Sequence, residues 1–239
     1  MIFNHDKKFM VFMPWKTASS TLYIRLASFN QSPYSRFYYF NEHLKRVVHQ
    51  HITVADFKAL PENLIDLKKI SFVRNPYDRV YSGFIQIQKD LKEQPLLPFP
   101  YTWIKNHVIK QLSVNEQKLK QAHFDFDQWV SLLEPEDIYQ IGGNSSLPLH
   151  PAHYWTHDHD QQFVHFIGKV ETFDDDFQNM LNYLQITDNY NLENDNIGEL
   201  KTESDNSIYK YINKMSGQSI DKINLLFEKD FQLFGYKIL

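Results

Sequence analysis

Short, mostly apolar runs alternate with amphipathic stretches over the first 90 residues of the chain. Runs of this length suit buried strands, and apolar positions three or four residues apart suit helices. The predicted strands are 9–13, 46–50 and 70–73, and the predicted helices begin at Ser19, Thr53 and Tyr77. Strands and helices that alternate in this order form parallel sheets with right-handed crossovers. The pattern therefore predicts the α/β class, with a central parallel sheet flanked by helices.

The C-terminal part of the chain is predicted to be largely helical. Its predicted elements are a helical stretch over 103–133, a strand over 163–167, and helices from Thr172 and over 220–234. The apolar residues at core-like spacing in the first of these are Phe124, Phe126, Trp129, Val130 and Leu133. Carboxylates at 174–176 complement a helix N-terminus. The segments 141–159 and 188–206 are expected to be irregular, and loops as long as the first are often functional.

Composition narrows the class of protein. At 239 residues, the chain is expected to form one domain over 1–239. The sequence has no cysteine, which excludes disulfides, thiolate metal sites and a cysteine nucleophile. No signal-peptide pattern opens the chain, and no apolar run approaches the roughly 18 residues of a membrane span. We therefore expect a cytoplasmic protein without stable membrane insertion, and its oligomeric state is left open.

Charge is distributed unevenly. Residues 1–123 contain 18 Lys/Arg and 9 Asp/Glu, a balance of +9, and residues 124–239 contain 7 and 20, a balance of −13. A positive cleft in the first part would concentrate an anionic ligand. The acidic second part argues against a nucleic-acid-binding protein, which would need a basic face without such a counterweight.

The stretch 14–21, PWKTASST, connects the first predicted strand to the first predicted helix. The residues of this stretch that could contact an anion are Lys16, Thr17, Ala18, Ser19, Ser20 and Thr21. A helix start offers unpaired backbone N–H groups to an anion, and a lysine adds a full charge. The glycines of the G-x-x-x-x-G-K-[ST] nucleotide loop are missing. The stretch therefore predicts a sulfate or phosphate site, and the alternative is a plain helix start capped by Ser19 or Ser20.

A second polar turn follows the third predicted strand. Arg74 lies at the carboxyl end of that strand, where open α/β sheets bind ligands. Arg79 and Ser82 are three residues apart and share a helix face, which suits a second phosphate. The alternative is that Arg79 pairs on the surface with Asp78 or Asp56. Two such sites in one sheet predict a ligand with two separated anionic groups.

These residues resemble the two signatures of sulfotransferases that use 3′-phosphoadenosine 5′-phosphosulfate (PAPS). The signatures are PWKTASST at 14–21 and VRNPYDRVYS at 73–82. Further similarities, in the family's order, are HQHITVADF at 49–57, FIGKVETF at 166–173 and FGY at 234–236. The stretch 49–57 is similar to a segment of heparan sulfate 2-O-sulfotransferases, which indicates the carbohydrate branch. Trp15 and Ala18 differ from many relatives, and 86–121 has no counterpart.

The resemblance implies a P-loop-kinase-like sulfotransferase fold, PAPS as sulfate donor and no metal. The loop from Lys16 to Thr21 would hold the 5′-phosphosulfate, with Lys16 stabilising the leaving oxygen. Arg74 and Ser82 would hold the 3′-phosphate. The acceptor would be a hydroxyl of a glycan or polysaccharide, chosen by the loops 86–121 and 141–159. Animal relatives act in the Golgi and carry a membrane anchor. This sequence shows neither a membrane span nor a cysteine for disulfides, so we expect a bacterial cytoplasmic enzyme.

His51 is the candidate general base for the acceptor hydroxyl. An imidazole with its ordinary pKa near 6.5 is largely neutral at cytoplasmic pH, so turnover should rise with pH through that value. His51 is expected beyond the end of the second predicted strand, on the same rim as the two anion sites. His49 would face the same side and orient the acceptor. His153 and Glu171 are the rival bases.

Four histidines and two aspartates form a further cluster near the end of the long loop. Its members are His150, His153, His157, His159, Asp158 and Asp160. Histidines spaced three or four residues apart can bind zinc on a helix, but Pro148 and Pro151 disfavour a regular helix there. The remaining interpretations are a surface loop or acceptor binding, with His153 as the candidate contact.

Two other functions fit the same fold. A small-molecule or nucleotide kinase would use the loop for ATP, but the loop lacks glycines and no aspartate suited to Mg²⁺ follows an apolar strand. A protein without catalytic activity could instead bind a nucleotide or a sulfated glycan. That reading would be favoured if Lys16 or His51 were replaced, and both residues are present.

Overall fold

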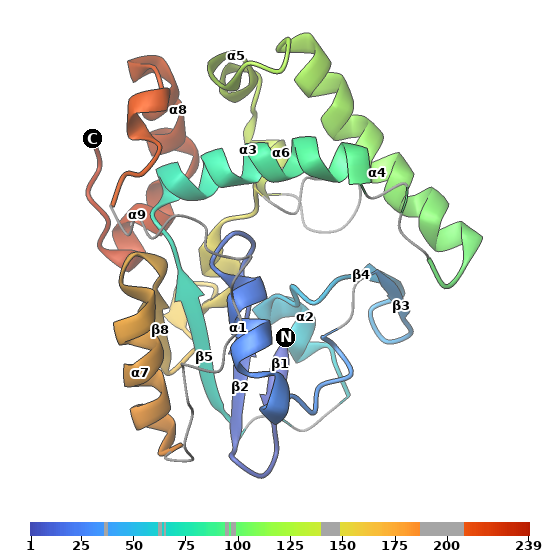
Figure 1. Cartoon of the computed structure of the whole chain (residues 1–239), viewed down its shortest axis with the longest axis vertical. Helices are drawn as coiled ribbons and strands as arrows, with labels where there is room; N and C mark the ends of the chain where they lie inside the picture. The colour runs from blue at the N-terminus through green and yellow to red at the C-terminus, as the bar shows by residue number, and fades with distance from the viewer. Residues whose placement is uncertain are drawn as a thin grey trace.

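A four-stranded sheet in the order β1-β2-β5-β8 forms the middle of the protein (Figure 1). The structure, a computed structural model, describes residues 1–35, 38–61, 64, 66–93, 96, 99–139, 149–186 and 208–239. The strands β2 (Phe9–Phe12), β5 (Lys68–Val73) and β8 (Phe166–Lys169) are parallel, and β1 (Ile2–Asn4) is an antiparallel edge strand. The predicted strands 9–13 and 70–73 are confirmed, and the strand predicted at 163–167 lies three residues later at its start.

The strand predicted at 46–50 is not part of this sheet. β4 (Arg46–Val48) pairs antiparallel with β3 (Tyr39–Asn41) in a separate two-stranded hairpin. An antiparallel partner can be reached through a short turn, whereas a parallel one needs a long crossover. Asn41 supports this turn, because its Oδ1 accepts hydrogen bonds from the backbone N–H groups of His43 and Leu44, both at 3.0 Å. The expectation of three strand–helix repeats in the sheet was therefore wrong at its second repeat.

Helices cover both faces of the sheet. α1 (Ser19–Arg25) and α7 (Phe173–Leu184) pack on one face, and α2 (Val54–Lys58) packs on the other. The side chains of β2 alternate between these layers, since Phe9 and Val11 join the first cluster and Met10 and Phe12 join the second. Strands buried on both faces are apolar at every position, which explains the uninterrupted apolar run in the sequence.

A helical layer lies beyond the carboxyl end of β5. It contains α3 (Pro76–Glu93), α4 (Thr102–Gln121), α5 (Phe126–Ser131), α6 (Pro135–Tyr139), α8 (Gly217–Leu226) and α9 (Glu228–Phe234). Figure 1 shows α3 crossing above the end of β5. Side chains from α3, α5, α8 and α9 share one apolar cluster, which includes Trp129 and Phe231. This layer confirms the helical C-terminal part expected from the sequence.

Two of the predicted helices are interrupted. The stretch 103–133 divides after Gln121, where His123 and Phe124 have positive φ (50° and 58°) and Asp125 begins a new helix by accepting the N–H of Gln128. Phe124 is half exposed and does not join the core, in contrast to its prediction. The stretch 220–234 divides at Phe227 between α8 and α9.

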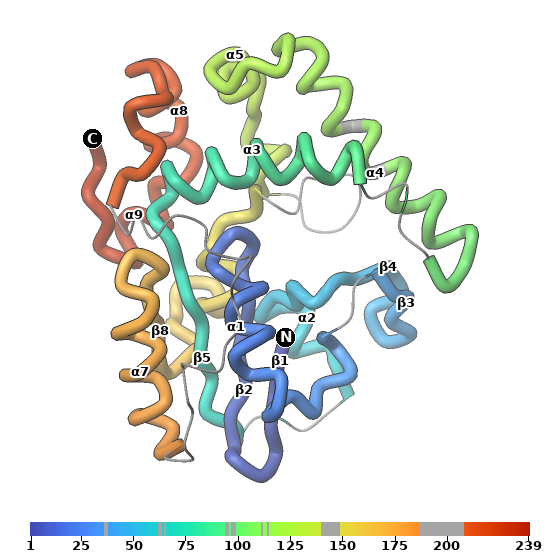
Figure 2. Tube along the Cα trace, viewed as in Figure 1, coloured from blue at the N-terminus to red at the C-terminus, as the bar shows by residue number. Residues whose placement is uncertain are grey.

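The remaining short elements complete the chain. They are 3-10 helices at Ala27–Phe29, Ala152–Trp155, Val170–Thr172 and Ile212–Lys214, and a small hairpin of β6 (His157–Asp158) and β7 (Gln161–Gln162). The segment 188–206 and the first part of the loop 141–159 lie outside the described residues. Figure 2 shows the C-terminus beside α8, and the N–H of Leu239 donates to Tyr77 Oη there (2.9 Å). Within the described ranges, none of the helices has the length and apolar character needed to cross a membrane.

Candidate functional site

The loop between β2 and α1 has an unusual backbone for a segment without glycine. Lys16 and Ala18 have positive φ (62° and 59°), whereas Thr17 between them does not. Such alternation turns successive N–H groups toward a common point, the arrangement of an anion-binding nest. Thr17 is fully buried and its hydroxyl donates to the Pro14 carbonyl (2.9 Å), which holds the loop from inside. The local geometry therefore matches the predicted anion loop.

The hydroxyls at the start of α1 are not capping groups. Ala18 is the N-cap residue and makes no side-chain cap, so the alternative of a helix capped by Ser19 or Ser20 is wrong. Ser19, Ser20 and Thr21 lie in the first turn of α1, and each is at least partly accessible. Their hydroxyls remain available to a ligand, while that of Thr17 is already used.

Lys16 is held near the site by a neutral partner. Its Nζ donates to Gln86 Oε1 (2.9 Å), and Gln86 Nε2 in turn donates to Asp90 Oδ1 (2.7 Å), both on α3. Burial, together with the charge of Arg74, lowers the pKa of Lys16 to about 8. No direct ion pair is assigned to Lys16 within the described part of the chain, and the Asp90 carboxylate beyond Gln86 offsets part of its charge.

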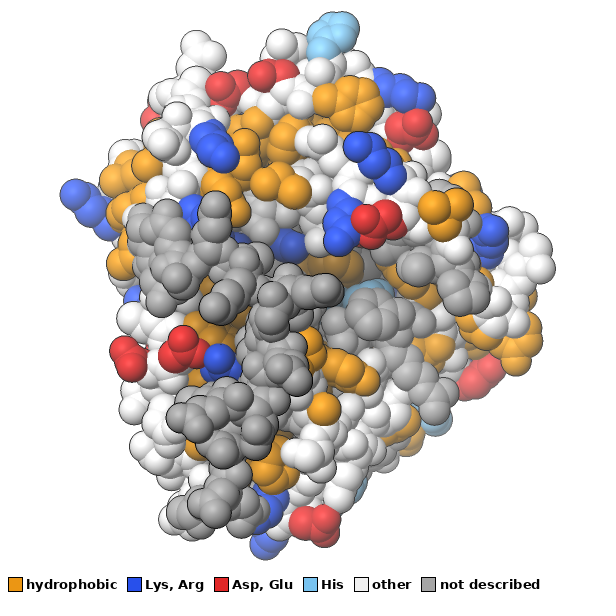
Figure 3. Space-filling model, in the orientation of Figure 1, with side chains coloured by type: hydrophobic (Ala, Val, Ile, Leu, Met, Phe, Trp, Pro, Cys, Tyr) orange, Lys and Arg blue, Asp and Glu red, His pale blue; other side chains and the backbone are white. Residues whose placement is uncertain are grey.

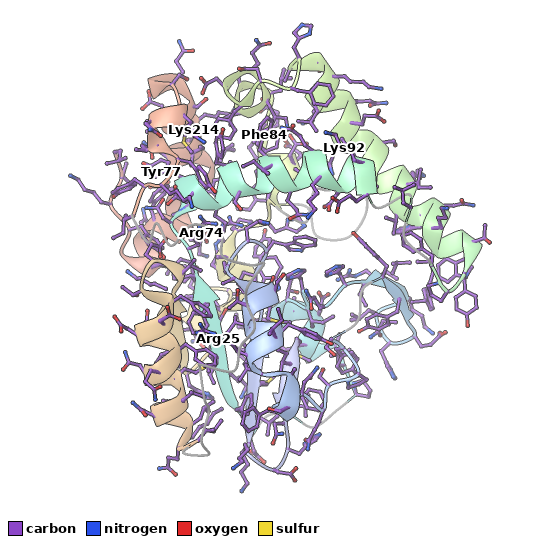
Figure 4. The ribbon with its side chains drawn as sticks, viewed as in Figure 1. Arg25, Arg74, Tyr77, Phe84, Lys92 and Lys214 are labelled. Atoms are coloured by element: carbon purple, nitrogen blue, oxygen red, sulfur yellow. The ribbon has the colours of Figure 1, made fainter. Side chains whose placement is uncertain are left out.

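The turn between β5 and α3 carries Arg74. The next residue, Asn75, fixes this turn: its N–H donates to Glu171 Oε1 (2.6 Å) and its Oδ1 accepts the N–H of Tyr77 (3.0 Å). The Arg74 guanidinium lies over the ring of Tyr211 (5.9 Å to the centroid), and Lys214 approaches the same ring (5.5 Å). Figure 4 shows Arg74 at the end of β5, close to the start of α3. Among the described residues, Arg74 has no assigned ion pair.

Arg79 has a different role from the one predicted. It is fully buried, and its guanidinium donates to the His150 carbonyl (2.7 Å) and reaches Asp230 Oδ2 (3.5 Å). Neither the phosphate role nor the surface pairing with Asp78 or Asp56 is correct, because Arg79 faces α9 and the apolar layer. Ser82, one turn further along α3, is partly accessible. Of the two α3 residues proposed for a phosphate, Ser82 alone could contact one.

His49 and His51 meet the loop between β2 and α1 although β4 is not in the central sheet. The His51 Nδ1 is hydrogen-bonded to the carbonyl oxygen of Met13, the residue after β2. A carbonyl can only accept, so Nδ1 carries the proton and Nε2 keeps its lone pair. Trp15 stacks on His51 with 4.1 Å between ring centroids. The structure thus brings His51, His49 and the loop of Lys16 together.

Burial controls the protonation of both histidines. Desolvation lowers the pKa of His51 to about 3, and Lys16 contributes in the same direction. Desolvation and the neighbouring His51 hold the pKa of His49 well below its ordinary value. Both rings are therefore neutral across the physiological range. The expected titration of His51 near 6.5 does not agree with this environment.

The two rival bases are engaged elsewhere. Glu171 accepts the N–H of Asn75 and the hydroxyl of Tyr236 (2.9 Å). His153 is buried, and its Nδ1 pairs with Asp230 Oδ1 (2.7 Å) in the network that also holds Arg79. Both side chains fix the packing around the turn of Arg74 and the helix α9.

The histidine cluster does not converge on a common point. His150 Nδ1 is bonded to the Ile138 carbonyl (2.7 Å), and His157 Nδ1 to Thr156 Oγ1 (2.8 Å). His159 is exposed, with positive φ (54°). Within the described ranges, no three His, Cys, Asp or Glu side chains are placed to hold a metal ion.

Three residues that contribute to the candidate site or its support were not predicted from the sequence. Gln86 and Asp230 occur in stretches without a recognisable motif, and Trp15 was noted as a difference in the loop without a role. Gln86 lies in the middle of α3, so its proximity to Lys16 depends on how α3 crosses the sheet. Figure 3 shows Lys and Arg side chains gathered over α3 on the face toward the viewer.

Comparison with known proteins supports one family. No curated protein and no solved structure matches the chain. The model of the sulfotransferase family matches residues 1–237, which include both strand–loop–helix units, the histidine pair and the C-terminal helices. Family membership supports sulfuryl transfer as the general chemistry. The chain therefore belongs to the sulfotransferase family.

Proposed function

We propose that the protein transfers the sulfuryl group of PAPS to a hydroxyl of a carbohydrate acceptor. The observation that carries this proposal is the meeting of three groups at the carboxyl edge of β2 and β5. Lys16 follows β2, Arg74 follows β5, and His51 is bonded to the Met13 carbonyl at the end of β2. Ligands of open α/β sheets bind at this edge.

The residues present fit a donor with two anionic ends. The alternating backbone at 16–18, the Lys16 charge and the hydroxyls of Ser19, Ser20 and Thr21 suit the 5′-phosphosulfate. Arg74 and Ser82 suit the 3′-phosphate, because a guanidinium and a hydroxyl bind phosphate oxygens well. The two cations are close enough that the charge of Arg74 lowers the pKa of Lys16. Bound PAPS would supply the sulfuryl group and a bisphosphate leaving group.

Lys16 and His51 would divide the chemistry of the protein. Sulfuryl transfer resembles phosphoryl transfer, in which positioning and charge stabilisation dominate. Lys16 would stabilise negative charge on the leaving oxygen. His51 Nε2 would accept the proton of the acceptor hydroxyl, since Nδ1 already donates to Met13. An anion held at the Lys16 loop would raise the pKa of His51 above its low value and make the ring a better base.

Aromatic side chains beside the histidines support a carbohydrate acceptor. The ring of Tyr38 meets His49 edge-on (5.0 Å between centroids) and lies 5.8 Å from Phe99. Phe40 contacts Trp103 (5.4 Å), and almost half of the Trp103 surface is exposed. Accessible aromatic faces suit the apolar faces of sugar rings, while the ring hydroxyls remain free for polar contacts. His49 would orient the sugar next to His51. His153, by contrast, is proposed to contact the acceptor only from its place in the histidine cluster of the sequence, since its side chain faces Asp230.

Mass spectrometry of a glycan panel incubated with the protein and PAPS tests this proposal. A mass gain of one SO₃ unit on a glycan, absent with Lys16→Ala, supports it. Calorimetry with adenosine 3′,5′-bisphosphate and with ATP addresses the kinase alternative, which requires tighter binding of ATP. Bisphosphate binding without sulfation of any glycan or small hydroxyl compound would favour the non-catalytic alternative.

A further inference from the structure

The indole of Trp15 contacts both histidines of the site at once. Its centroid lies 4.1 Å from that of His51 and 5.0 Å from that of His49, with interplanar angles of 29° and 32°. The two imidazoles are parallel within 3°, at 4.8 Å. His51 is thus stacked on both the indole of Trp15 and the imidazole of His49, and the indole also contacts His49.

This contact adds a constraint that the hydrogen bond of His51 lacks. The bond from Nδ1 to the Met13 carbonyl favours one orientation of the ring, but rotation about the Cβ–Cγ bond (χ2) would break it and allow the proton to move to Nε2. Flat rings against the imidazole oppose that rotation, because turning the ring would lose its face contacts with them. The direction of Nε2 is therefore set jointly by Met13, by the indole of Trp15 and by the parallel ring of His49.

Core packing alone does not explain why a tryptophan occupies position 15. The side chain is buried within the apolar cluster below the sheet, with 8% of its surface exposed. Its Nε1 has no hydrogen-bond partner among the described residues. A buried donor without a partner is unfavourable, and Leu or Phe would fill apolar space without one. Trp and Phe both have a flat ring that can stack on an imidazole, and Leu does not.

We propose that Trp15 is a positioning residue whose indole face holds the His51 imidazole with Nε2 toward the acceptor hydroxyl. This inference rests on the proposed role of His51 as base. It also links the two halves of the site, because Trp15 directly precedes Lys16, whose backbone is held at positive φ. The loop proposed to bind the donor thus carries the ring that orients the base.

The orientation can be tested without any substrate. We compare ¹⁵N shifts of the His51 ring at pH 7.5 in the wild type, Trp15→Phe, Trp15→Leu and Trp15→Met. The wild type and Trp15→Phe should show one tautomer, with Nδ1 protonated. The Leu and Met variants should show shifts averaged between the two tautomers. The exposed His43 is an internal reference, and thermal unfolding identifies the folded variants. Wild-type His51 shifts in whichever of the Leu and Met variants folds would overturn the proposal.

Kinetics provide the second readout. In the Leu variant, the turnover number should fall by about 10–100-fold, the scale of a misplaced reacting group. The Kd for adenosine 3′,5′-bisphosphate should stay within about threefold, because the stack addresses the base and not the donor. Trp15→Phe should restore turnover to within a few-fold of the wild type. An equal loss of bisphosphate affinity and turnover would mean that Trp15 only shapes the loop. A wild type without transferase activity would refute the proposed function, while the ring shifts would still decide the orientation of His51.

Discussion

Two arginines only five residues apart have different environments in this chain, and their partners explain the difference. Arg79 is buried against Asp230 and the His150 carbonyl, so its charge and hydrogen bonds serve the fold. Arg74 lies on the ring of Tyr211, and the described residues provide no carboxylate for it. Lys16 resembles Arg74 in this respect, with the neutral Gln86 as its partner. Cations without a direct ion pair at the edge of a parallel sheet are the groups expected to bind an anionic ligand.

Lys16→Ala should lower turnover by at least ~10²-fold, because one preorganised charge is lost from the site. The fold should be retained, since the side chain is at the rim. The cationic form of Lys16 exists below its pKa of about 8, so kcat/KM of the wild type should fall as pH rises through about 8. A bound anion raises this pKa, and kcat should therefore fall at higher pH than kcat/KM. In Lys16→Arg, which stays charged, the alkaline fall should disappear; turnover within a few-fold of the wild type in Lys16→Ala would exclude the loop as the sulfate site.

Arg74→Ala should weaken binding of adenosine 3′,5′-bisphosphate by ~2–5 kcal/mol, because a charge-paired phosphate loses its partner. Adenosine 5′-phosphosulfate, which has no 3′-phosphate, should bind nearly as before. Calorimetry with both ligands makes the comparison, and the exposed Lys92→Ala on the following helix, α3, is the control for a general loss of positive charge. Losses of similar size for the two ligands would assign Arg74 to another task.

His51→Ala should lower the turnover number by ~10²–10⁴-fold, the usual contribution of a general base. Because burial lowers the pKa of His51 to about 3, the ring is neutral well below pH 6.5. The profile of kcat/KM should therefore be flat between pH 5 and 7, in contrast to the rise near 6.5 expected from the sequence. His49→Ala should affect the KM of the acceptor more than the turnover number. An acid limb near 6.5 that is lost in His51→Ala would show that the ring is more solvated than the structure has it.

Local patterns predicted the elements that local interactions determine. The units from β2 to α1 and from β5 to α3 were expected from apolar runs followed by polar turns. The helix expected to begin at Thr53 is α2, and the Thr53 hydroxyl caps it by accepting the Asp56 N–H (3.1 Å). The pairing of β4 with β3 was missed, because periodicity shows a strand but not its neighbour. Gln86, Asp230 and the contact of Trp15 with His51 depend on how distant elements pack, and no local pattern carries that information.

The buried ion pair between Arg79 on α3 and Asp230 on α9 links the two helices, and loss of its carboxylate should destabilise the fold. Asp230 accepts the N–H of Ala152 (2.7 Å) and pairs with Arg79 and His153. Asp230→Asn should lower the free energy of unfolding by about 3–5 kcal/mol, since Arg79 keeps a buried charge without a counterion. Urea unfolding measures this. The control is Asp160→Asn, whose carboxylate pairs with Lys229 at the surface and should leave the stability nearly unchanged. Similar effects of the two substitutions would show that the buried pair does not stabilise the fold.

At the scale of the whole molecule, ion pairs join the basic and acidic parts of the chain. The pairs Arg25–Asp174 (2.8 Å), Lys58–Asp158 (2.6 Å) and Lys118–Asp137 each connect a cation before residue 124 with a carboxylate after it. Much of the charge asymmetry is thus balanced at contacts between layers. Among the described residues, neither Lys16 nor Arg74 is in a direct ion pair, although the Asp90 carboxylate offsets part of the Lys16 charge.

The buried histidines should also make the stability of the whole molecule depend on pH. Unfolded, His51 has a pKa near 6.5, and burial lowers it to about 3 in the fold. The unfolded chain therefore binds more protons below pH 6.5, so this contribution to stability is complete above 6.5 and is lost as pH falls toward 3. The slope is about 1.4 kcal/mol per pH unit for one histidine, or about 2 kcal/mol between pH 6.5 and 5. His49 acts in the same direction, because its pKa is also lowered.

Urea unfolding at pH 7.5 and pH 5.0 measures this linkage. The wild type should be less stable at pH 5.0, and His51→Gln, which cannot titrate, should lose about 2 kcal/mol less than the wild type over the same interval. The exposed His43→Gln is the control and should behave like the wild type. Bound adenosine 3′,5′-bisphosphate should reduce the loss, since an anion near Lys16 favours the protonated ring in the fold. An equal pH dependence in His51→Gln and the wild type would mean that the imidazole is not desolvated, and the tautomer and base assignments that depend on its burial would fall with it.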